Sequence, residues 1–167
     1  DKWTSYEIAE IAFESERLHL GISGGWQDQY ATVFGGFNFI EFKSDENLVF
    51  PMRLKKEIKY ELEESLVLCY TKTTHDSNLI HENQKLTSLK KEINQNIKKN
   101  VDLTYEMKKF LLKGNLKELG KCLDKAWEFK KSFSTKITNK HLDKIYNGAK
   151  KNGALGLSLI HISEPTR

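Results

Sequence analysis

Three glycines within five residues, in the segment from Gly21 to Gly25, constrain the fold of this chain more than any other feature. Glycine is a poor helix former, so a helix cannot run through this segment. Residues 5–20 have the apolar spacing of a helix, and residues 26–33 can begin another. Gly35-Gly36 ends that second helix. The front of the chain is therefore expected to form short elements joined by a tight glycine turn.

The expected first helix carries two local signals. Ile8, Ile11, Ala12 and Ser15 mark one face at helical spacing. Thr4 is followed three residues later by Glu7, which is typical of a capping box at a helix start. We therefore expect the helix to begin directly after Thr4.

Three short strands are predicted. Residues 37–42 alternate Phe, Asn and Phe and then become apolar, and residues 48–54 form a second strand with Pro51 at an edge or near its end. Residues 66–70 are wholly apolar, so we expect a strand covered on both faces. Cys69, within that strand, is then a buried free thiol. The set Phe37, Phe39 and Phe42 is expected in a core rather than in a ligand platform.

The rest of the chain is expected to be helical. The predicted helices span residues 77–98, 102–113, 116–129 and 139–151. Gly114-Asn115 reads as a helix stop followed by an N-cap, and Thr138-Asn139 caps the last helix. The third helix has an apolar stripe of Leu116, Leu119, Leu123, Ala126 and Trp127. The change from a Gly- and aromatic-rich front to a Lys-, Glu- and Leu-rich back predicts a domain boundary near residue 56.

Charge and cysteine usage exclude several classes of protein. The 27 basic residues exceed the 23 acidic ones by only four, and they are interleaved along the chain. No basic block alternates with aromatics, which argues against nucleic-acid binding. No apolar run approaches the ~20 residues of a membrane helix. Cys69 and Cys122 lack the spacing of a zinc site or redox motif. A cytoplasmic chain without a membrane or nucleic-acid partner is expected.

The C-terminal segment, residues 157–167, is similar codon for codon to a translated transposase adaptor from DNA library preparation. We interpret it as a sequencing scar and exclude it from the fold. The reading frame is then expected to be interrupted after Gly156. The chain also begins without Met, so we expect it to lack both ends of the protein to which it belongs.

Two carboxylates flank the glycine turn. Asp28 lies just inside the helix that opens after the turn, and Glu16 lies near the end of the preceding helix. Backbone N–H groups at such a turn suit an anion such as a phosphate, and the two acids could serve as a base and a magnesium ligand. From the residues alone, an ordinary turn without a function explains the pattern as well.

A second group, His75, Asp76 and His81, could bind a metal, but its spacing fits no strong zinc motif. A helix N-cap at Asp76 or Ser77 explains the group better. His75 could also contribute to a sugar site. His19 is expected at a surface or an interface.

The motif Gly-Gly-Trp-Gln-Asp-Gln-Tyr-Ala at residues 24–31, with Phe-Gly-Gly-Phe-Asn-Phe-Ile-Glu-Phe at residues 34–42, resembles the GHMP kinases. The resemblance is to the heptose-phosphate kinase branch, and weaker agreement extends it over residues 1–156. It implies an ATP-dependent phosphorylation of D-glycero-D-manno-heptose 7-phosphate. By the same resemblance, Asp28 matches the catalytic aspartate and Glu16 matches the acidic Mg²⁺ ligand. The residues implied to line the sugar site are Ser23, Gly24, Gly25 and Gln27. Trp26 receives no role.

The resemblance also implies an α+β fold. Residues 1–56 would be the end of a ribosomal-S5-like N-terminal domain, and residues 57–156 an incomplete, helix-rich ferredoxin-like C-terminal domain. The family's Gly-Leu-Gly-Ser-Ser phosphate loop does not occur in the chain. We therefore expect the chain alone to be inactive.

Other functions stay open at this point. A galactokinase-like or fucokinase-like enzyme is the alternative within the family, and a non-enzymatic helical binding module is the alternative outside it. A kinase requires Glu16 and Asp28 to face one groove, whereas a binding module requires an exposed apolar stripe in the back half. The sugar's anomer and the oligomeric state stay open.

Overall fold

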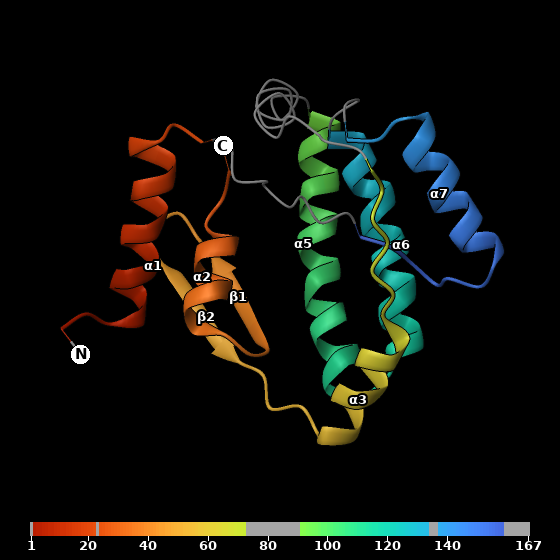
Figure 1. Ribbon diagram of the computed structural model, residues 1–167, viewed down its shortest axis with the longest axis horizontal. Coiled ribbons are helices and arrows are strands. Elements are labelled where there is room, and N and C mark those ends of the chain that lie inside the picture. The colour runs from red at the N-terminus through yellow and green to blue at the C-terminus, as the bar shows by residue number, and fades with distance from the viewer. Residues whose placement is uncertain (1, 23, 73–90, 134–136, 159–167) are drawn as a thin grey trace. The chain divides into compact units, whose positions relative to one another are not determined.

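The computed structural model describes residues 2–22, 24–72, 91–133 and 137–158. The chain divides into two compact units, Asp1–Leu54 and Lys55–Arg167, which are called unit 1 and unit 2 below. Unit 1 carries the short elements of the front of the chain, and unit 2 carries the long helices (Figure 1). That these units correspond to the N- and C-terminal domains of a GHMP kinase stays a prediction.

The first helix, α1, spans Ser5–Glu14 and continues into one π-helical turn, η1, over Ser15–His19. The predicted capping box is confirmed at its start. The backbone N–H of Glu7 donates to Thr4 Oγ1 at 3.2 Å, and the backbone N–H of Thr4 donates to Glu7 Oε2 at 2.7 Å. The first backbone N–H groups of a helix have no acceptor within the helix, and these two bonds satisfy two of them.

The buried face of α1 is not the face that Ile8 and Ile11 mark. These two side chains are 44% and 46% exposed, whereas Ala9 is fully buried. Tyr6 instead packs edge-on against Phe34 with a centroid distance of 4.9 Å, and Phe13 stacks on Trp26 at 4.4 Å. Aromatic pairs therefore decide which side of α1 faces the rest of unit 1.

The helix α2 spans Gln27–Phe34 and is followed by an antiparallel hairpin of β1, Asn38–Phe42, and β2, Asn47–Pro51. Phe39 pairs with Phe50 in the hairpin register. Both predicted strands are present, but β2 ends at Pro51 rather than at the predicted residue 54, so Pro51 lies at the end of the strand. Phe39 is buried as expected, but Phe37 and Phe42 are 39% and 40% exposed. Of the three phenylalanines that were expected in a core, only Phe39 is therefore buried.

Unit 2 contains four described helices. These are α3 at Lys56–Ser65, α5 at Lys91–Leu112, α6 at Leu116–Phe133 and α7 at Lys140–Lys151. Helix α3 was not expected from the sequence. The predicted break between residues 98 and 102 is wrong, because α5 runs through it; no Gly or Pro interrupts the stretch. The first part of the predicted helix at 77–98 lies outside the described residues.

The predicted starts of α6 and α7 are confirmed, whereas α6 ends at Phe133, four residues beyond the predicted end at residue 129. Gly114 has a left-handed φ of 70°, and Asn115 Oδ1 accepts from Glu118 N at 3.3 Å. The Asn139 side chain accepts from His141 N and Leu142 N, both at 3.0 Å. Local chemistry sets each of these helix ends.

The core of unit 2 lies where α6 and α7 meet. Trp127 and Ile137 are buried, with Phe133 and Tyr146 packed against them. Leu119 and Trp127 of the predicted α6 stripe are buried, so that stripe faces inward. The backbone of Gly156 passes over α6 so closely that an added Cβ would lie 2.0 Å from Gly120 O.

The predicted strand at residues 66–70 is wrong. The segment after α3 is extended but belongs to no strand in the described part of the chain, and it leads toward the start of α7 (Figure 1). Val67 and Leu68 are 90% and 83% exposed, and Cys69 is exposed rather than buried. An apolar run predicts burial only where another element covers it, and the described residues provide no such cover.

The fold is helix-rich α+β, with one two-stranded sheet in the described residues. The α+β class is confirmed at this level. The ribosomal-S5-like and ferredoxin-like assignments stay predictions. In the described ranges, no helix combines the length and the apolar character that crossing a membrane would need.

Candidate functional site: the glycine turn between η1 and α2

The glycine turn begins where η1 ends. Leu20 N donates to Ser15 O at 3.2 Å, which is the bond across five residues that closes a π-helical turn, and Ile22 N donates to Glu16 O at 3.2 Å just after η1 ends. Gly21 follows in the left-handed region with φ 66°, a conformation that favours glycine. The chain thereby leaves the helix and turns toward α2. Single π turns are frequent at functional sites.

Arg17 lies beneath the turn, and the sequence analysis gave it no role. Its guanidinium donates to Ile22 O at 3.3 Å and to Gly25 O at 3.2 Å. Its side chain is only 10% exposed. The arginine therefore holds two carbonyl groups of the turn, one near each end. The signal that could have found it is a basic residue placed just before a glycine-rich turn whose carbonyl groups need hydrogen-bond donors.

The Glu16 carboxylate, the predicted metal ligand, is held by two neighbours. Its Oε1 lies 3.3 Å from Arg17 Nη1, and its Oε2 accepts a hydrogen bond from Gln29 Nε2. Gln29 is a buried residue of α2, so the bond joins η1 to α2 across the turn. A carboxylate has about four lone-pair sites, so each oxygen keeps capacity for a further partner.

Asp28, the predicted catalytic residue, lies in the first turn of α2 and is exposed. Its neighbour Gln29 makes the bond to Glu16, so the structure brings Glu16 to the residue beside Asp28. Consecutive helical side chains point about 100° apart. That the Glu16 and Asp28 carboxylates face one groove therefore stays a prediction.

The predicted sugar-site residues lie around the start of α2. Gly24, Gly25 and Gln27 are exposed, and Ser23 lies outside the described residues. The N-cap position is Trp26, whose side chain makes no capping hydrogen bond. The first backbone N–H groups of a helix are not used within it and carry partial positive charge. The turn can therefore receive an anionic group, and the predicted role of these residues stays a prediction.

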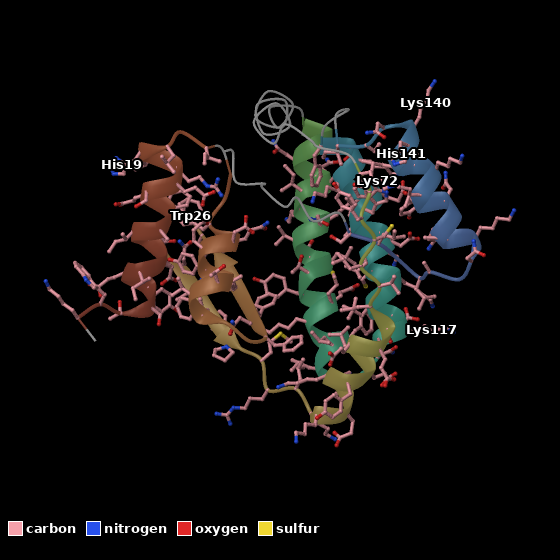
Figure 2. The ribbon with its side chains drawn as sticks, in the orientation of Figure 1. His19, Trp26, Lys72, Lys117, Lys140 and His141 are labelled. Atoms are coloured by element: carbon pink, nitrogen blue, oxygen red, sulfur yellow. The ribbon has the colours of Figure 1, made fainter. Side chains whose placement is uncertain are left out.

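Trp26, for which the sequence suggested no function, anchors the start of α2 (Figure 2). Its indole stacks on Phe13 of α1 at a centroid distance of 4.4 Å, and its Nε1–H donates to Glu10 Oε2 at 3.3 Å. The turn is therefore fixed at its far end by packing against α1.

Glu10 is the centre of a polar network under the site. Its Oε1 accepts from the Tyr30 hydroxyl and from Asn47 Nδ2, the latter at 3.0 Å, and its Oε2 accepts from Trp26. Tyr30 is 1% exposed. Burial, with the hydrogen bond to Glu10, raises the pKa of Tyr30 from 10.0 to about 12. The network ties α1, α2 and β2 together. It was not expected from the sequence, because the spacing of Glu10 does not distinguish it from the other glutamates of α1.

The described residues contain no group of three His, Cys, Asp or Glu side chains arranged to hold a metal ion. His75, Asp76, Ser77 and His81 lie outside those residues. His19 is exposed at the end of η1, as the sequence analysis expected for a surface residue (Figure 2). His141 of unit 2 has a ring nitrogen 3.0 Å from Thr71 O, which ties the extended segment to α7.

Comparison with known proteins identifies the family to which the chain is related. Residues 107–162 match the family described as GHMP kinases C terminal. Over 153 residues the chain is 41% identical to D-glycero-alpha-D-manno-heptose 7-phosphate kinase from Campylobacter jejuni, with 89% of the chain covered. The chain is a relative of the GHMP kinases. The resemblance that the glycine turn predicted is thereby confirmed.

Two solved structures, described as those of a heptose kinase and a sugar kinase, resemble the present chain. A D-glycero-D-manno-heptose 1-phosphate kinase from Bacteriodes thetaiotaomicron matches with a TM-score of 0.66 and 33% sequence identity. The match covers 95% of the present chain and 42% of the kinase chain. A Campylobacter jejuni protein described as a sugar kinase matches with a TM-score of 0.58 and 34% sequence identity. The match covers 91% of the present chain and 42% of that protein's chain.

The chain spans less than half the length of these relatives, covering 44% of the Campylobacter jejuni heptose 7-phosphate kinase. The family match runs to residue 162, six residues into the segment interpreted as an adaptor. Leu157 and Ser158 line a 250 Å³ cavity between α5 and α6, and residues 159–167 lie outside the described part of the chain. The adaptor interpretation stays a prediction.

Proposed function

We propose that this chain is part of an ATP-dependent, Mg²⁺-requiring kinase that phosphorylates a sugar phosphate, D-glycero-D-manno-heptose 7-phosphate. The observation that carries the proposal is the 41% identity to a heptose 7-phosphate kinase across the region that contains the glycine turn. We place the kinase in the cytoplasm, where ATP and phosphorylated sugars are available.

The arrangement of the turn supports this chemistry. Asp28 is exposed in the first turn of α2, where an acceptor hydroxyl could reach it. In the proposed reaction, that hydroxyl attacks the γ-phosphorus of ATP, the bond to the β–γ bridging oxygen breaks, and ADP leaves. Asp28 orients the hydroxyl and accepts its proton. Phosphoryl transfer needs little covalent help from a protein, so positioning and charge account for most of the catalysis.

The residues present fit a magnesium ion in part. Mg²⁺ prefers oxygen ligands and is usually held by one or two carboxylates together with substrate phosphates. Glu16 offers such a carboxylate, already oriented by Arg17 and Gln29. When bound, the ion would neutralise charge on the phosphates. The nearby Arg17 guanidinium weakens the attraction of Glu16 for a cation, so phosphate oxygens must supply much of the binding.

The names of the relatives differ in the position of the substrate phosphate. The curated relative is a heptose 7-phosphate kinase, whereas one structural neighbour is described as a heptose 1-phosphate kinase. We favour the 7-phosphate because that relative has the higher identity, 41% against 33%. A galactokinase-like or fucokinase-like specificity is the alternative.

We further propose that the 167-residue chain alone does not phosphorylate a sugar. Backbone donors of a glycine-rich loop normally hold the nucleotide phosphates, and the chain contains no Gly-Leu-Gly-Ser-Ser sequence. Without a nucleotide-binding loop, Glu16 has no metal–nucleotide complex to complete.

A coupled ADP-release assay tests both proposals. The chain alone should give no turnover on heptose 7-phosphate. A completed kinase, in which residues 1–156 are expressed with natural coding sequence on both sides, should turn over heptose 7-phosphate but not galactose or mevalonate. Turnover by the chain alone would contradict its inactivity, and a completed kinase that prefers galactose would contradict the substrate.

The alternative of a helical binding module stays open on the criterion of an exposed apolar stripe in the back half. Leu119 and Trp127 of the α6 stripe are buried within unit 2, so α6 does not offer such a stripe. Helix α5 does offer one, because four of its apolar side chains are 37–50% exposed at helical spacing: Ile97, Val101, Tyr105 and Leu112. The kinase is favoured over this alternative by the 41% identity to a heptose 7-phosphate kinase.

A further inference from the structure

The contacts of Arg17 connect the parts of the glycine turn that the proposed reaction would use. Its guanidinium bonds Ile22 O at 3.3 Å and Gly25 O at 3.2 Å, and Nη1 lies 3.3 Å from Glu16 Oε1. One planar group therefore contacts the predicted metal ligand and both ends of the turn. Glycine segments are flexible by themselves, so an external clamp is needed to give this turn a single shape.

The guanidinium is suited to this task in a way that an ammonium group is not. Arginine presents five N–H donors in a rigid planar fork, whereas lysine presents a compact charge on a flexible stem. Nη1 serves Ile22 O and Glu16 Oε1 while Nη2 serves Gly25 O, so the contacts use two donor nitrogens held apart in one plane, whereas all three donors of an ammonium group lie on a single nitrogen. Replacing Arg17 by Lys would keep the positive charge but lose the simultaneous contacts.

Gly24 packs directly against this clamp. A Cβ added at Gly24 would lie 2.5 Å from the Arg17 guanidinium carbon. Its φ lies outside the left-handed region, so an alanine would not strain the backbone at Gly24. A side chain at Gly24 would therefore meet Arg17, whereas the local backbone conformation would accept it. An alanine at this position would push the guanidinium, the far end of a flexible side chain, away from its present position at Ile22 O and Gly25 O.

The clamp also orients the start of α2. The peptide bonds of the described residues are trans, so the N–H of Trp26 points opposite to the C=O of Gly25 in their shared peptide unit. Because Gly25 O is held by Arg17, the Trp26 N–H is directed away from Arg17, two residues before Asp28. Loss of Arg17 would free this peptide to rotate.

We propose that Arg17 is a positioning residue that holds the glycine turn, the Glu16 carboxylate and the Gly25–Trp26 peptide before α2 in the geometry for phosphoryl transfer. The proposal rests on the proposed kinase function for its catalytic part. Its structural part, a turn clamped by Arg17 and coupled to Gly24, stands without that function and is tested separately.

The first test uses the 167-residue chain and hydrogen exchange read by mass spectrometry. Arg17→Met, Arg17→Lys and Gly24→Ala should each make exchange in peptides covering residues 20–30 at least about tenfold faster, because local opening becomes easier. Peptides from α5 and α6 should not change. Arg53→Met, which removes an exposed arginine, and Gly148→Ala, where an added Cβ meets nothing within 4 Å, are the matched controls.

The second test measures kcat and KM in the completed kinase, well below the unfolding temperature of each variant. Arg17→Met and Arg17→Lys should lower kcat about 10–100-fold, since a misplacement near 1 Å can cost about 10²-fold. The KM for ATP should change less than about threefold. Gly24→Ala should reproduce the loss. Arg17→Met combined with Gly24→Ala should be no worse than either alone, because both remove the same contact.

Each result decides a separate point. Unchanged exchange in Arg17→Met would overturn the clamp, and additive effects of the double variant would overturn the coupling to Gly24. A kcat retained by Arg17→Lys or Arg17→Met, with only a lower unfolding temperature, would reduce Arg17 to a structural residue. A completed kinase without turnover on any sugar, with Arg17 intact, would instead refute the proposed function, and the exchange data would then still decide the clamp.

Discussion

Replacing Tyr30 by Phe should destabilise unit 1 through one hydroxyl group. The Tyr30 hydroxyl donates to Glu10 and accepts from Asn47 Nδ2 at 3.2 Å, in a side chain that is 1% exposed. Phe fills nearly the same space, so no cavity forms. Asn47 keeps its bond to Glu10 at 3.0 Å, so the main loss is a hydrogen bond to a charged group. Such bonds contribute about 1.5–3 kcal/mol, and we expect a loss of about 2 kcal/mol.

The same substitution should remove a pH dependence. The pKa of Tyr30 is raised from 10.0 to about 12, which means that the folded state binds this proton more tightly than the unfolded state does. The resulting stability is fully present below pH 10 and is lost as the pH rises through 12. The difference in unfolding free energy between wild type and Tyr30→Phe should therefore shrink across that interval.

Urea unfolding at pH 7 and at pH 10.5 to 11.5 measures both effects. In a Trp127→Phe background, which removes the tryptophan of unit 2, tryptophan fluorescence reports on unit 1, where the Trp26 indole stacks on Phe13. With a slope of about 1–2 kcal/mol per molar urea for a unit of this size, the midpoint should fall by about 1–2 M. Tyr60→Phe, at a tyrosine that is 57% exposed, is the control. A shift equal to that of Tyr60→Phe, or a difference independent of pH, would refute the role of the network.

Three further predictions concern other parts of the chain. In the completed kinase, Asp28→Asn should lower kcat about 10²–10⁴-fold with a smaller effect on KM; full activity would remove Asp28 from the mechanism. Gly156→Ala should destabilise unit 2 by about 1–3 kcal/mol in thermal unfolding, because the added Cβ would overlap the α6 backbone. The control Gly148→Ala should not lower the melting temperature, because its Cβ meets no atom within 4 Å. Equal melting temperatures of the two variants would contradict the packing of Gly156 on α6. In the native chain a thiol reagent should modify exposed Cys69 quickly and Cys122 slowly. The Cys122 side chain is 3% exposed, and burial raises the pKa of its thiol. Equal modification rates would contradict the burial of Cys122.

Features that depend on a few neighbouring residues could be predicted from the sequence. The Thr4–Glu7 capping box, the Asn139 cap and the left-handed Gly114 all follow from side chains bonding, or backbones turning, within a few positions. The hairpin of residues 38–51 follows from alternating apolar residues around a polar turn. The glycine turn with Glu16 and Asp28 was located by its residue pattern and by its resemblance to the GHMP kinases.

Features that depend on distant partners required the tertiary structure. The apolar run at residues 66–70 is exposed, although its composition favours burial, since hydrophobic sequence does not specify what covers it. Glu10 looks like a solvated helix glutamate, yet it accepts hydrogen bonds from Trp26, Tyr30 and Asn47. Arg17 likewise lies under the turn because it bonds carbonyl groups five and eight residues away. A polar group becomes buried only where the folded chain supplies its partners, and local sequence spacing does not contain that information.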